Sequence, residues 1–172
     1  MKKILIVVDM QHDFVDGSLG TKEAQAILPA VNELIASGKF DDVYFTFDTH
    51  YPDYPETAEG KKLPVPHCIY GTEGWALATE TSPADEAHIA VKNTFGYTGW
   101  AEKLGGAEET ESITVIGLCT DICVVSNALI LKALFPEIPI FCDASCCAGT
   151  TPEAHRAALS VMKSCQIDVI NE

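Results

Sequence analysis

Short apolar runs alternate with longer segments of mixed polarity along the chain, and the two kinds of segment predict different elements. The apolar runs predict buried strands over 3–8, 42–47, 88–91, 113–117, 138–142 and 166–170. Helices are predicted between them over about 21–37, 120–134 and 151–164. Strands that are apolar on both faces and separated by helices are typical of a parallel sheet that helices cover on both sides.

This alternation continues without a repeat, a low-complexity tract or a linker, so we expect a single domain over residues 1–172. A chain of this length buries roughly two-thirds of its unfolded surface when it folds. The segment 48–87 is polar, contains several prolines and shows little periodicity. We expect it to form loops over one edge of the domain.

Side chains that can take part in catalysis or binding follow the ends of four predicted strands. Asp9 follows the first strand, Asp48 the second and Lys92 the third. The fourth strand runs into the segment Gly117–Cys123. In parallel sheets the ligand crevice lies outside the carboxyl ends of the strands. The sequence therefore predicts two carboxylates, one ammonium group and one thiol along the same rim.

Cys123 is the cysteine that this placement favours as a nucleophile. Thr120 or Asp121 can cap the helix that follows, which places Cys123 in its first turn. Free amides and the helix dipole stabilise a thiolate there, a lysine lowers the thiol pKa further, and an aspartate can accept the proton. Cys119 competes with Cys123, but it precedes the helix and so lacks the first-turn amides.

Composition narrows the classes of partner. Eleven basic and twenty-five acidic side chains give a formal net charge of −14. That balance argues against binding to nucleic acid or to an anionic membrane surface, and leaves small neutral or cationic ligands. No apolar run approaches the roughly 20 residues of a membrane span, and the apolar run Ile4–Val8 is too short for a signal peptide. We expect a cytoplasmic protein whose seven cysteines are reduced thiols.

Three segments resemble the isochorismatase-like cysteine hydrolases and, within them, the nicotinamidases: "LIVVDMQHDFVDGSL", "VKNTFGYTGW" and "VIGLCTDICV". The resemblance covers nearly the whole chain. It implies a three-layer α/β/α sandwich around a six-stranded, mostly parallel sheet, and a catalytic triad of Asp9, Lys92 and Cys123. It also implies a cis peptide bond at Leu118–Cys119 and an oxyanion hole made by the backbone amides of Cys119 and Cys123. By the same analogy we expect a homo-oligomer.

A metal site is the feature that separates nicotinamidases from the metal-free members of this family. Asp48 and His50 are two residues apart, and "PHCIYGTEG", which contains His67, resembles the nicotinamidase metal-histidine segment. The further histidine of the common pattern is missing, so Glu56 or Glu59 must replace it. We favour Glu59, because "AEGKKLP" resembles the variant of the site that contains a glutamate. Such a donor set suits Zn²⁺, Fe²⁺ or Mn²⁺.

The alternative interpretation is that "DTH" only closes a strand and that His67 only supports a loop. The remaining histidines, His12, His88 and His155, have no such context, and we expect structural or solvated roles for them.

The expected substrate pocket departs from the family pattern, because "LPVPH" lacks the tryptophan that usually precedes the metal-histidine. We expect Phe14 to line the pocket, with Tyr70 or Tyr97 as further candidates. Trp75 and Trp100 are expected in the core or at the rim.

The resemblance implies hydrolysis of a small carboxamide, nicotinamide first, to the acid and ammonia through a thioester. The principal alternative is a metal-free hydrolase of the same family that acts on another small amide or ureido compound. A non-catalytic binding module is disfavoured by the complete triad, and a flavodoxin-like carrier by the absence of a phosphate-binding loop after the first strand.

Overall fold

The computed structural model describes residues 1–172, apart from the side chain of Ala107. Its six strands form one sheet in the order β3-β2-β1-β4-β5-β6, and every neighbouring pair is parallel. The strands are β1 (Lys2–Val8), β2 (Asp42–Asp48), β3 (Ile89–Lys92), β4 (Thr110–Leu118), β5 (Ile140–Ala148) and β6 (Asp168–Ile170). The predicted parallel sheet is confirmed.

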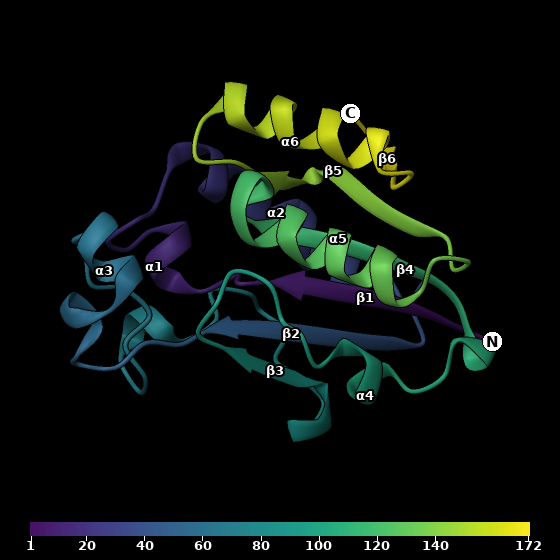
Figure 1. The fold of residues 1–172 in the computed structure, drawn as a ribbon, viewed down its shortest axis with the longest axis horizontal. Helices are drawn as coiled ribbons and strands as arrows, with labels where there is room; N and C mark the ends of the chain where they lie inside the picture. Colours follow the sequence, from purple (N-terminus) through teal and green to yellow (C-terminus); the bar gives the residue numbers. More distant parts are fainter.

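Helices lie on both faces of this sheet. They are α1 (His12–Val15), α2 (Lys22–Ala36), α3 (Ala58–Lys62), α4 (Trp100–Leu104), α5 (Val125–Leu134) and α6 (Pro152–Ser164). Figure 1 shows α5 in front of the sheet and α2 behind it, which confirms the three-layer α/β/α arrangement. No helix among the described residues is both long and apolar enough to cross a bilayer.

Local sequence signals explain where the two long outer helices begin. The hydroxyl of Thr21 accepts a hydrogen bond from the amide of Ala24 at the start of α2. At the start of α6, Thr151 does the same for Ala154, and Pro152 occupies the first helical position. A side-chain oxygen in this position satisfies an amide that the helix itself leaves free, and proline loses no hydrogen bond there.

The structure departs from the predicted elements where elements are short or polar. The segment 48–87 is not only loop, because it contains α3 and two 3₁₀ turns, at Tyr54–Glu56 and Glu73–Trp75, and a third 3₁₀ turn, Glu86–His88, begins at its end. Another 3₁₀ turn spans Ala107–Glu109. Helices of one turn leave too few residues for a helical period to be visible in the sequence. Strand β5 continues to Ala148, beyond the apolar run that predicted it.

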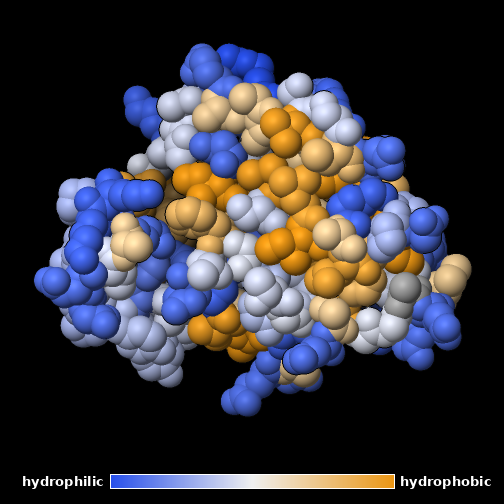
Figure 2. Space-filling model, viewed as in Figure 1, coloured by the Kyte–Doolittle hydropathy of each residue, from blue (hydrophilic) through white to orange (hydrophobic). Residues whose placement is uncertain are grey.

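The strand order decides where the four strand ends meet. The order in which the chain adds strands reverses at β1, because β2 and β3 lie on one side of it and β4 to β6 on the other. The carboxyl ends on both sides of β1 therefore open onto one crevice. In Figure 1, α1 and α3 lie at this end of the sheet. Figure 2, from the same side, shows hydrophilic side chains at that end and an apolar surface over α5.

Candidate active site

Strand β1 delivers Asp9 into the crevice at a point where the backbone turns sharply. Asp9 has a φ of 47°, in the left-handed region. Gly117, on the neighbouring strand β4, has a φ of +116°, and a Cβ there would lie 2.1 Å from the carbonyl oxygen of Val8. Only glycine permits this approach of β4 to the end of β1. The glycine that precedes the cysteine segment therefore has a steric role.

Asp9, Lys92 and Cys123 meet at the bottom of the crevice. The Lys92 Nζ donates a hydrogen bond to Asp9 Oδ2 at 2.6 Å and lies 3.7 Å from Cys123 Sγ. Asp9 is fully buried, and Lys92 and Cys123 are each 5% exposed. Three strand ends thus bring together a carboxylate, an ammonium group and a thiol, with the ammonium group between the other two.

Thr46 on β2 fixes the second oxygen of the Asp9 carboxylate, a contact that the sequence analysis missed. Its hydroxyl donates to Asp9 Oδ1 and accepts from the backbone amide of Asp9 at 3.0 Å. Burial raises the pKa of Asp9, while the charge of Lys92 and the hydrogen bond from Thr46 lower it; the net shift is upward. A carboxylate with a raised pKa is a stronger proton acceptor than one in water.

The pKa of Cys123 differs from the sequence expectation of a stabilised thiolate. Burial and the Asp9 carboxylate raise the pKa of this thiol well above its ordinary value, against the opposing charge of Lys92. Burial also lowers the pKa of Lys92, but the negative charges of Asp9 and Cys123 outweigh it and raise that pKa. In the free protein the thiol therefore keeps its proton beside a charged lysine.

The turn that carries Cys123 also differs from the predicted capped helix. Residues Thr120–Val124 form a π-helical turn ahead of α5, and Cys119 is the N-cap residue. Thr120 hydrogen-bonds through its hydroxyl to His155 Nδ1 at 2.8 Å. The Asp121 carboxylate accepts hydrogen bonds from the amide and the hydroxyl of Thr150, at 2.8 and 2.6 Å. Both predicted caps are wrong, because each side chain is taken by a partner from the α6 side of the molecule.

Cys119, the competing cysteine, differs from Cys123 in the peptide bond that precedes it. The peptide bond Leu118–Cys119 is cis, as the family resemblance implied. Burial, followed by the charge of Asp121, raises the pKa of the Cys119 thiol to about 12. All seven cysteines are free thiols, as predicted, and Cys142 and Cys147 approach to 3.8 Å between sulfur atoms.

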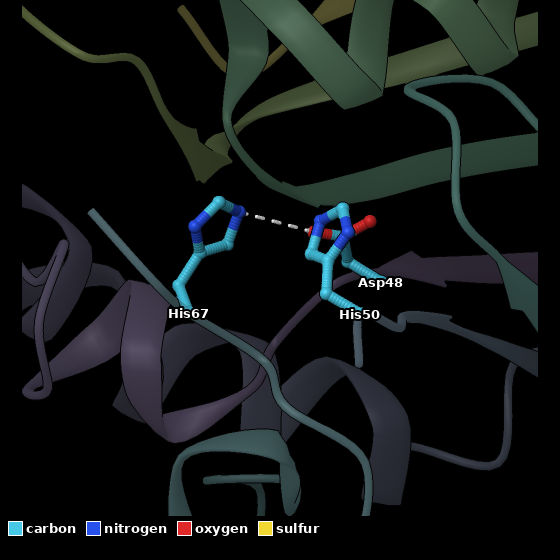
Figure 3. A group of neighbouring side chains, drawn as sticks. All are labelled: Asp48, His50 and His67. Atoms are coloured by element: carbon cyan, nitrogen blue, oxygen red, sulfur yellow. Dashed lines mark hydrogen bonds and ion pairs between the residues drawn. The ribbon is translucent and has the colours of Figure 1, made fainter. Parts of the chain in front are cut away.

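A group of metal-ligand type lies beside the triad. Figure 3 shows His50 and His67 with ring nitrogens toward the Asp48 carboxylate. The Nε2 atoms of His50 and His67 lie 3.0 and 3.4 Å from Asp48 Oδ2. Glu59 Oε1 lies 3.8 Å from His50 Nε2 and 3.5 Å from His67 Nε2. Ligands about 2.0–2.1 Å from a tetrahedral ion are roughly 3.3 Å apart, so this donor set fits such an ion.

Local contacts prepare these side chains for that role. The His67 Nδ1 contacts the carbonyl oxygen of Val65 at 2.8 Å, which leaves Nε2 facing the group. The Thr57 hydroxyl caps α3 and so sets the first turn that presents Glu59, whereas Glu56 is exposed. The structure therefore places Glu59, the favoured carboxylate, beside both histidines.

Charge links this group to the triad. Asp48 Oδ1 lies 3.6 Å from Lys92 Nζ, while Oδ2 faces the histidines. Burial tends to raise the pKa of Asp48, but hydrogen bonds from His50 and His67 hold it well below its usual range. Burial lowers the pKa of His67, but its hydrogen bonds to Asp48 and Glu59 outweigh this and raise it to about 10. Asp48 is therefore ionised, and it contacts both Lys92 of the triad and the two histidines.

Gln11 is a second residue that the sequence analysis missed. It is fully buried, and its side chain forms paired hydrogen bonds with the backbone of Asp48. Gln11 Nε2 donates to the carbonyl of Asp48 at 2.9 Å and to that of Trp75 at 2.8 Å, and Oε1 accepts from the amide of Asp48 at 2.8 Å. The glutamine thus fixes the backbone from which the Asp48 carboxylate projects. In the sequence, its position two residues after Asp9 is the feature that points to a role for Gln11 near the site.

One cavity joins the two clusters. It has a volume of about 310 Å³, and its walls include Asp48, Glu59, His67, Cys119 and Cys123. Its remaining walls are mostly apolar, with Phe14, Leu19, Leu63, Phe95 and Ile122 beside Thr21 and Thr150.

The aromatic candidates divide between this cavity and the rest of the protein. Phe14 lines it, with its ring centroid 5.4 Å from that of His67. Tyr70 and Tyr97 pack against Trp75 and Trp100 instead. Trp100 is fully buried, and Trp75 packs on Phe47.

The other histidines contact side chains outside the cavity. His12 pairs with Asp16, His88 with Asp85, and His155 with Thr120.

Comparison with known proteins places the whole chain in one family. The family model described as the isochorismatase domain matches residues 3–172. The isochorismatase family protein PncA of Bacillus subtilis is 31% identical over 179 residues, which cover 93% of each protein. The nicotinamidase/pyrazinamidase of Mycobacterium tuberculosis is 26% identical over 190 residues, which cover 98% of each protein.

Solved structures agree with this assignment. The nicotinamidase/pyrazinamidase PncA of Bacillus subtilis aligns with a TM-score of 0.83 at 30% identity, over 99% of this chain and 100% of that one. The pyrazinamidase of Pyrococcus horikoshii in complex with zinc aligns with a TM-score of 0.83 at 26% identity, over 100% of both chains. With its sheet order, its strand-end cluster and these matches along nearly its entire length, the chain belongs to the isochorismatase family.

Proposed function

We propose that this protein hydrolyses a small primary carboxamide, with nicotinamide as the first candidate, to the carboxylic acid and ammonia. One observation carries the proposal: Lys92 bridges the buried Asp9 carboxylate and the Cys123 thiol, and Cys123 forms part of the wall of a cavity. Relatives named as nicotinamidase/pyrazinamidase support this choice of amide. The apolar walls and the cavity volume of about 310 Å³ suit a small, largely apolar acyl group.

In the first half of the proposed reaction, Asp9 accepts the proton of the Cys123 thiol. The sulfur attacks the carbonyl carbon, a C–S bond forms, and the carbonyl electron pair moves to oxygen. The backbone amides of Cys119 and Cys123 are the proposed donors to that oxyanion. When the electron pair returns, the C–N bond breaks and Asp9 gives its proton to the departing nitrogen, which leaves as ammonia. The raised pKa values of Asp9 and Cys123 suit a proton that moves between them.

In the second half, water attacks the thioester. Asp9 accepts a proton from the water, the C–O bond forms, and the C–S bond breaks. The acid leaves, and Asp9 returns the proton to the sulfur of Cys123. Throughout, Lys92 remains charged beside the carboxylate and the sulfur, because its pKa is raised. It thereby offsets the negative charge that passes between them.

Asp48, His50 and His67, with Glu59, would hold a divalent metal, for which we propose Zn²⁺; Fe²⁺ and Mn²⁺ suit the same donors. The relative from Pyrococcus horikoshii was solved with zinc, which supports this choice. When bound, the metal would supply a Lewis-acid site for a ring nitrogen of the substrate. The protein's own part is to present these donors on the cavity wall that faces the thiol.

Ammonia release tests the proposed function directly. Purified protein is assayed with nicotinamide and a panel of small aliphatic and ureido amides, and its metal content is measured on the same sample. The proposal expects nicotinamide hydrolysis, bound metal, and no hydrolysis by Cys123→Ala. Hydrolysis of another amide by a protein without stoichiometric metal would instead support the metal-free alternative. Wild-type turnover by Cys123→Ala would refute the thioester mechanism.

A further inference from the structure

Asn127 is a fully buried polar residue on α5 with a hydrogen-bond partner for every group of its amide. Its Oδ1 accepts from the amide of Tyr97 and from Trp100 Nε1, both at 2.9 Å. Its Nδ2 donates to the carbonyl of Cys123 at 2.8 Å and to that of Phe95 at 3.3 Å. One side chain thus joins the residue that carries the nucleophile to the segment that follows β3.

The partners allow only one orientation of this amide. Tyr97 and Trp100 present N–H groups, which can only donate, and Cys123 and Phe95 present carbonyl oxygens, which can only accept. The side chain in the middle must therefore offer two donors and one oxygen with two lone pairs, which is the inventory of an amide. No other side chain of this size has that inventory.

The segment that Asn127 holds, residues 93–97, connects two parts of the proposed site. It begins directly after Lys92, and Phe95 forms part of the cavity wall. The segment also packs tightly on α5, because a Cβ at Gly96 would lie 2.4 Å from Cδ1 of Ile130. Phe95 itself is 47% exposed, so packing alone does not fix its position. Its carbonyl is held by Asn127.

We propose that Asn127 is a positioning residue for the reaction. It sets the distance between the wall at Phe95 and the turn at Cys123, and so fixes the width of the cavity. This inference rests on the proposed function, since it concerns the same site. Asn127 itself touches neither the cavity nor the reacting atoms among the described contacts, and it acts through Phe95 and Cys123.

Asn127→Ser separates the contact of Asn127 to Cys123 from its contact to Phe95. In a helix, a serine hydroxyl hydrogen-bonds to the carbonyl four residues earlier, which here is that of Cys123. The variant keeps that contact and loses those to Phe95, Tyr97 and Trp100. We expect KM for nicotinamide to rise on the order of 10-fold, with kcat close to that of the wild type, because the wall is released while the nucleophile turn stays held.

Asn127→Asp has the same shape but puts an acceptor oxygen, in place of the Nδ2 donor, against the carbonyls of Cys123 and Phe95. We expect both contacts, to Cys123 and to Phe95, to be lost, and kcat/KM to fall on the order of 10- to 100-fold. Trp100→Phe is the matched control, because it removes one hydrogen bond of Asn127 on the side away from the cavity. It should lower the melting temperature and keep the wild-type kcat and KM.

Hydrogen exchange of peptides that cover residues 93–99 supplies a readout independent of turnover. Exchange should accelerate in Asn127→Ser and stay slow in Trp100→Phe. Unchanged KM and unchanged exchange in Asn127→Ser would overturn the inference, as would an equal rise of KM in Trp100→Phe. If the wild type fails to hydrolyse nicotinamide, the proposed function fails, and the exchange result alone then decides whether Asn127 fixes the wall. Should Asn127→Asp not fold, Asn127→Ser decides the question by itself.

Discussion

At the scale of single residues, Asp9 shows how a buried acid is prepared to accept a proton. Its two oxygens have different partners, the hydroxyl of Thr46 and the ammonium group of Lys92. Burial raises its pKa, and these two partners moderate the rise. The affinity of Asp9 for a proton therefore exceeds that of an exposed aspartate.

Replacing Thr46 with valine tests this balance. The hydrogen bond from Thr46 lowers the pKa of Asp9, so its loss should raise that pKa further. Because only ionised Asp9 can accept the thiol proton, kcat/KM falls as the pH drops through this pKa. We expect the acid limb of the pH profile to shift to higher pH in Thr46→Val. Thr114→Val, at another buried threonine, should leave the limb unchanged. An unshifted limb in Thr46→Val would contradict the role of this hydroxyl.

The two neighbouring cysteines should respond differently to substitution. With its pKa raised to about 12, the thiol of Cys119 stays protonated at neutral pH, and in the proposal only its backbone amide is used. We expect Cys119→Ala to keep most of the activity, whereas Cys123→Ser should lose on the order of 10⁴-fold or more in kcat. Ammonia release with nicotinamide measures both. Comparable losses of kcat in the two variants would show that both thiols take part in the reaction.

At the scale of elements, the end of β2 is held by a side chain from another segment. Gln11 forms two hydrogen bonds with the backbone of Asp48 and a third with Trp75, where a neighbouring strand would otherwise lie. This clamp connects the start of α1 to the strand that presents Asp48. Buried backbone groups need such partners, since each one left without a hydrogen bond costs about 1–3 kcal/mol.

Gln11→Leu should therefore destabilise the fold by at least about 2 kcal/mol, because it leaves the amide and carbonyl of Asp48 buried without partners. Urea unfolding measures the change in free energy of unfolding. The same substitution at Gln25, an exposed residue of α2, is the control and should have little effect. Equal stability of the two variants would mean that the clamp contributes nothing.

At the scale of the whole molecule, the proposed metal donors lie within residues 48–67 but come from different elements of the fold. Asp48 ends β2, His50 follows it, Glu59 lies in α3, and His67 lies in the loop after α3. Only folding brings them together, so an ion that binds them stabilises the folded state and not the unfolded one.

Added zinc should therefore raise the melting temperature of chelator-treated protein. At a free concentration of 100 times Kd, binding adds about 2.7 kcal/mol to the free energy of unfolding. His67→Asn removes one donor and should abolish most of the shift, whereas His88→Asn, at a histidine outside the group, should keep it. Thermal melts with and without Zn²⁺ measure the difference. An undiminished shift in His67→Asn would place zinc elsewhere on the protein.

By itself, the sequence determined the parallel sheet and the set of polar residues at its strand ends. Buried strands appear as continuous apolar runs, and in a parallel sheet their carboxyl ends share one edge. The strand ends therefore predict Asp9, Asp48, Lys92 and Cys123 as neighbours, and the structure brings all four together. Glu59 and His67 were predicted from motif resemblance, because neither a helix of one turn nor a loop shows a period in the sequence.

Only the tertiary structure decided how these groups are tuned. The caps expected at Thr120 and Asp121 are replaced by contacts to His155 and Thr150. The Cys123 thiol has a raised rather than a lowered pKa, because burial outweighs the nearby lysine. The supporting roles of Gln11, Thr46 and Asn127 likewise depend on partners far away in the sequence. Burial and long-range hydrogen bonds exist only once the chain has folded, so no local pattern encodes them.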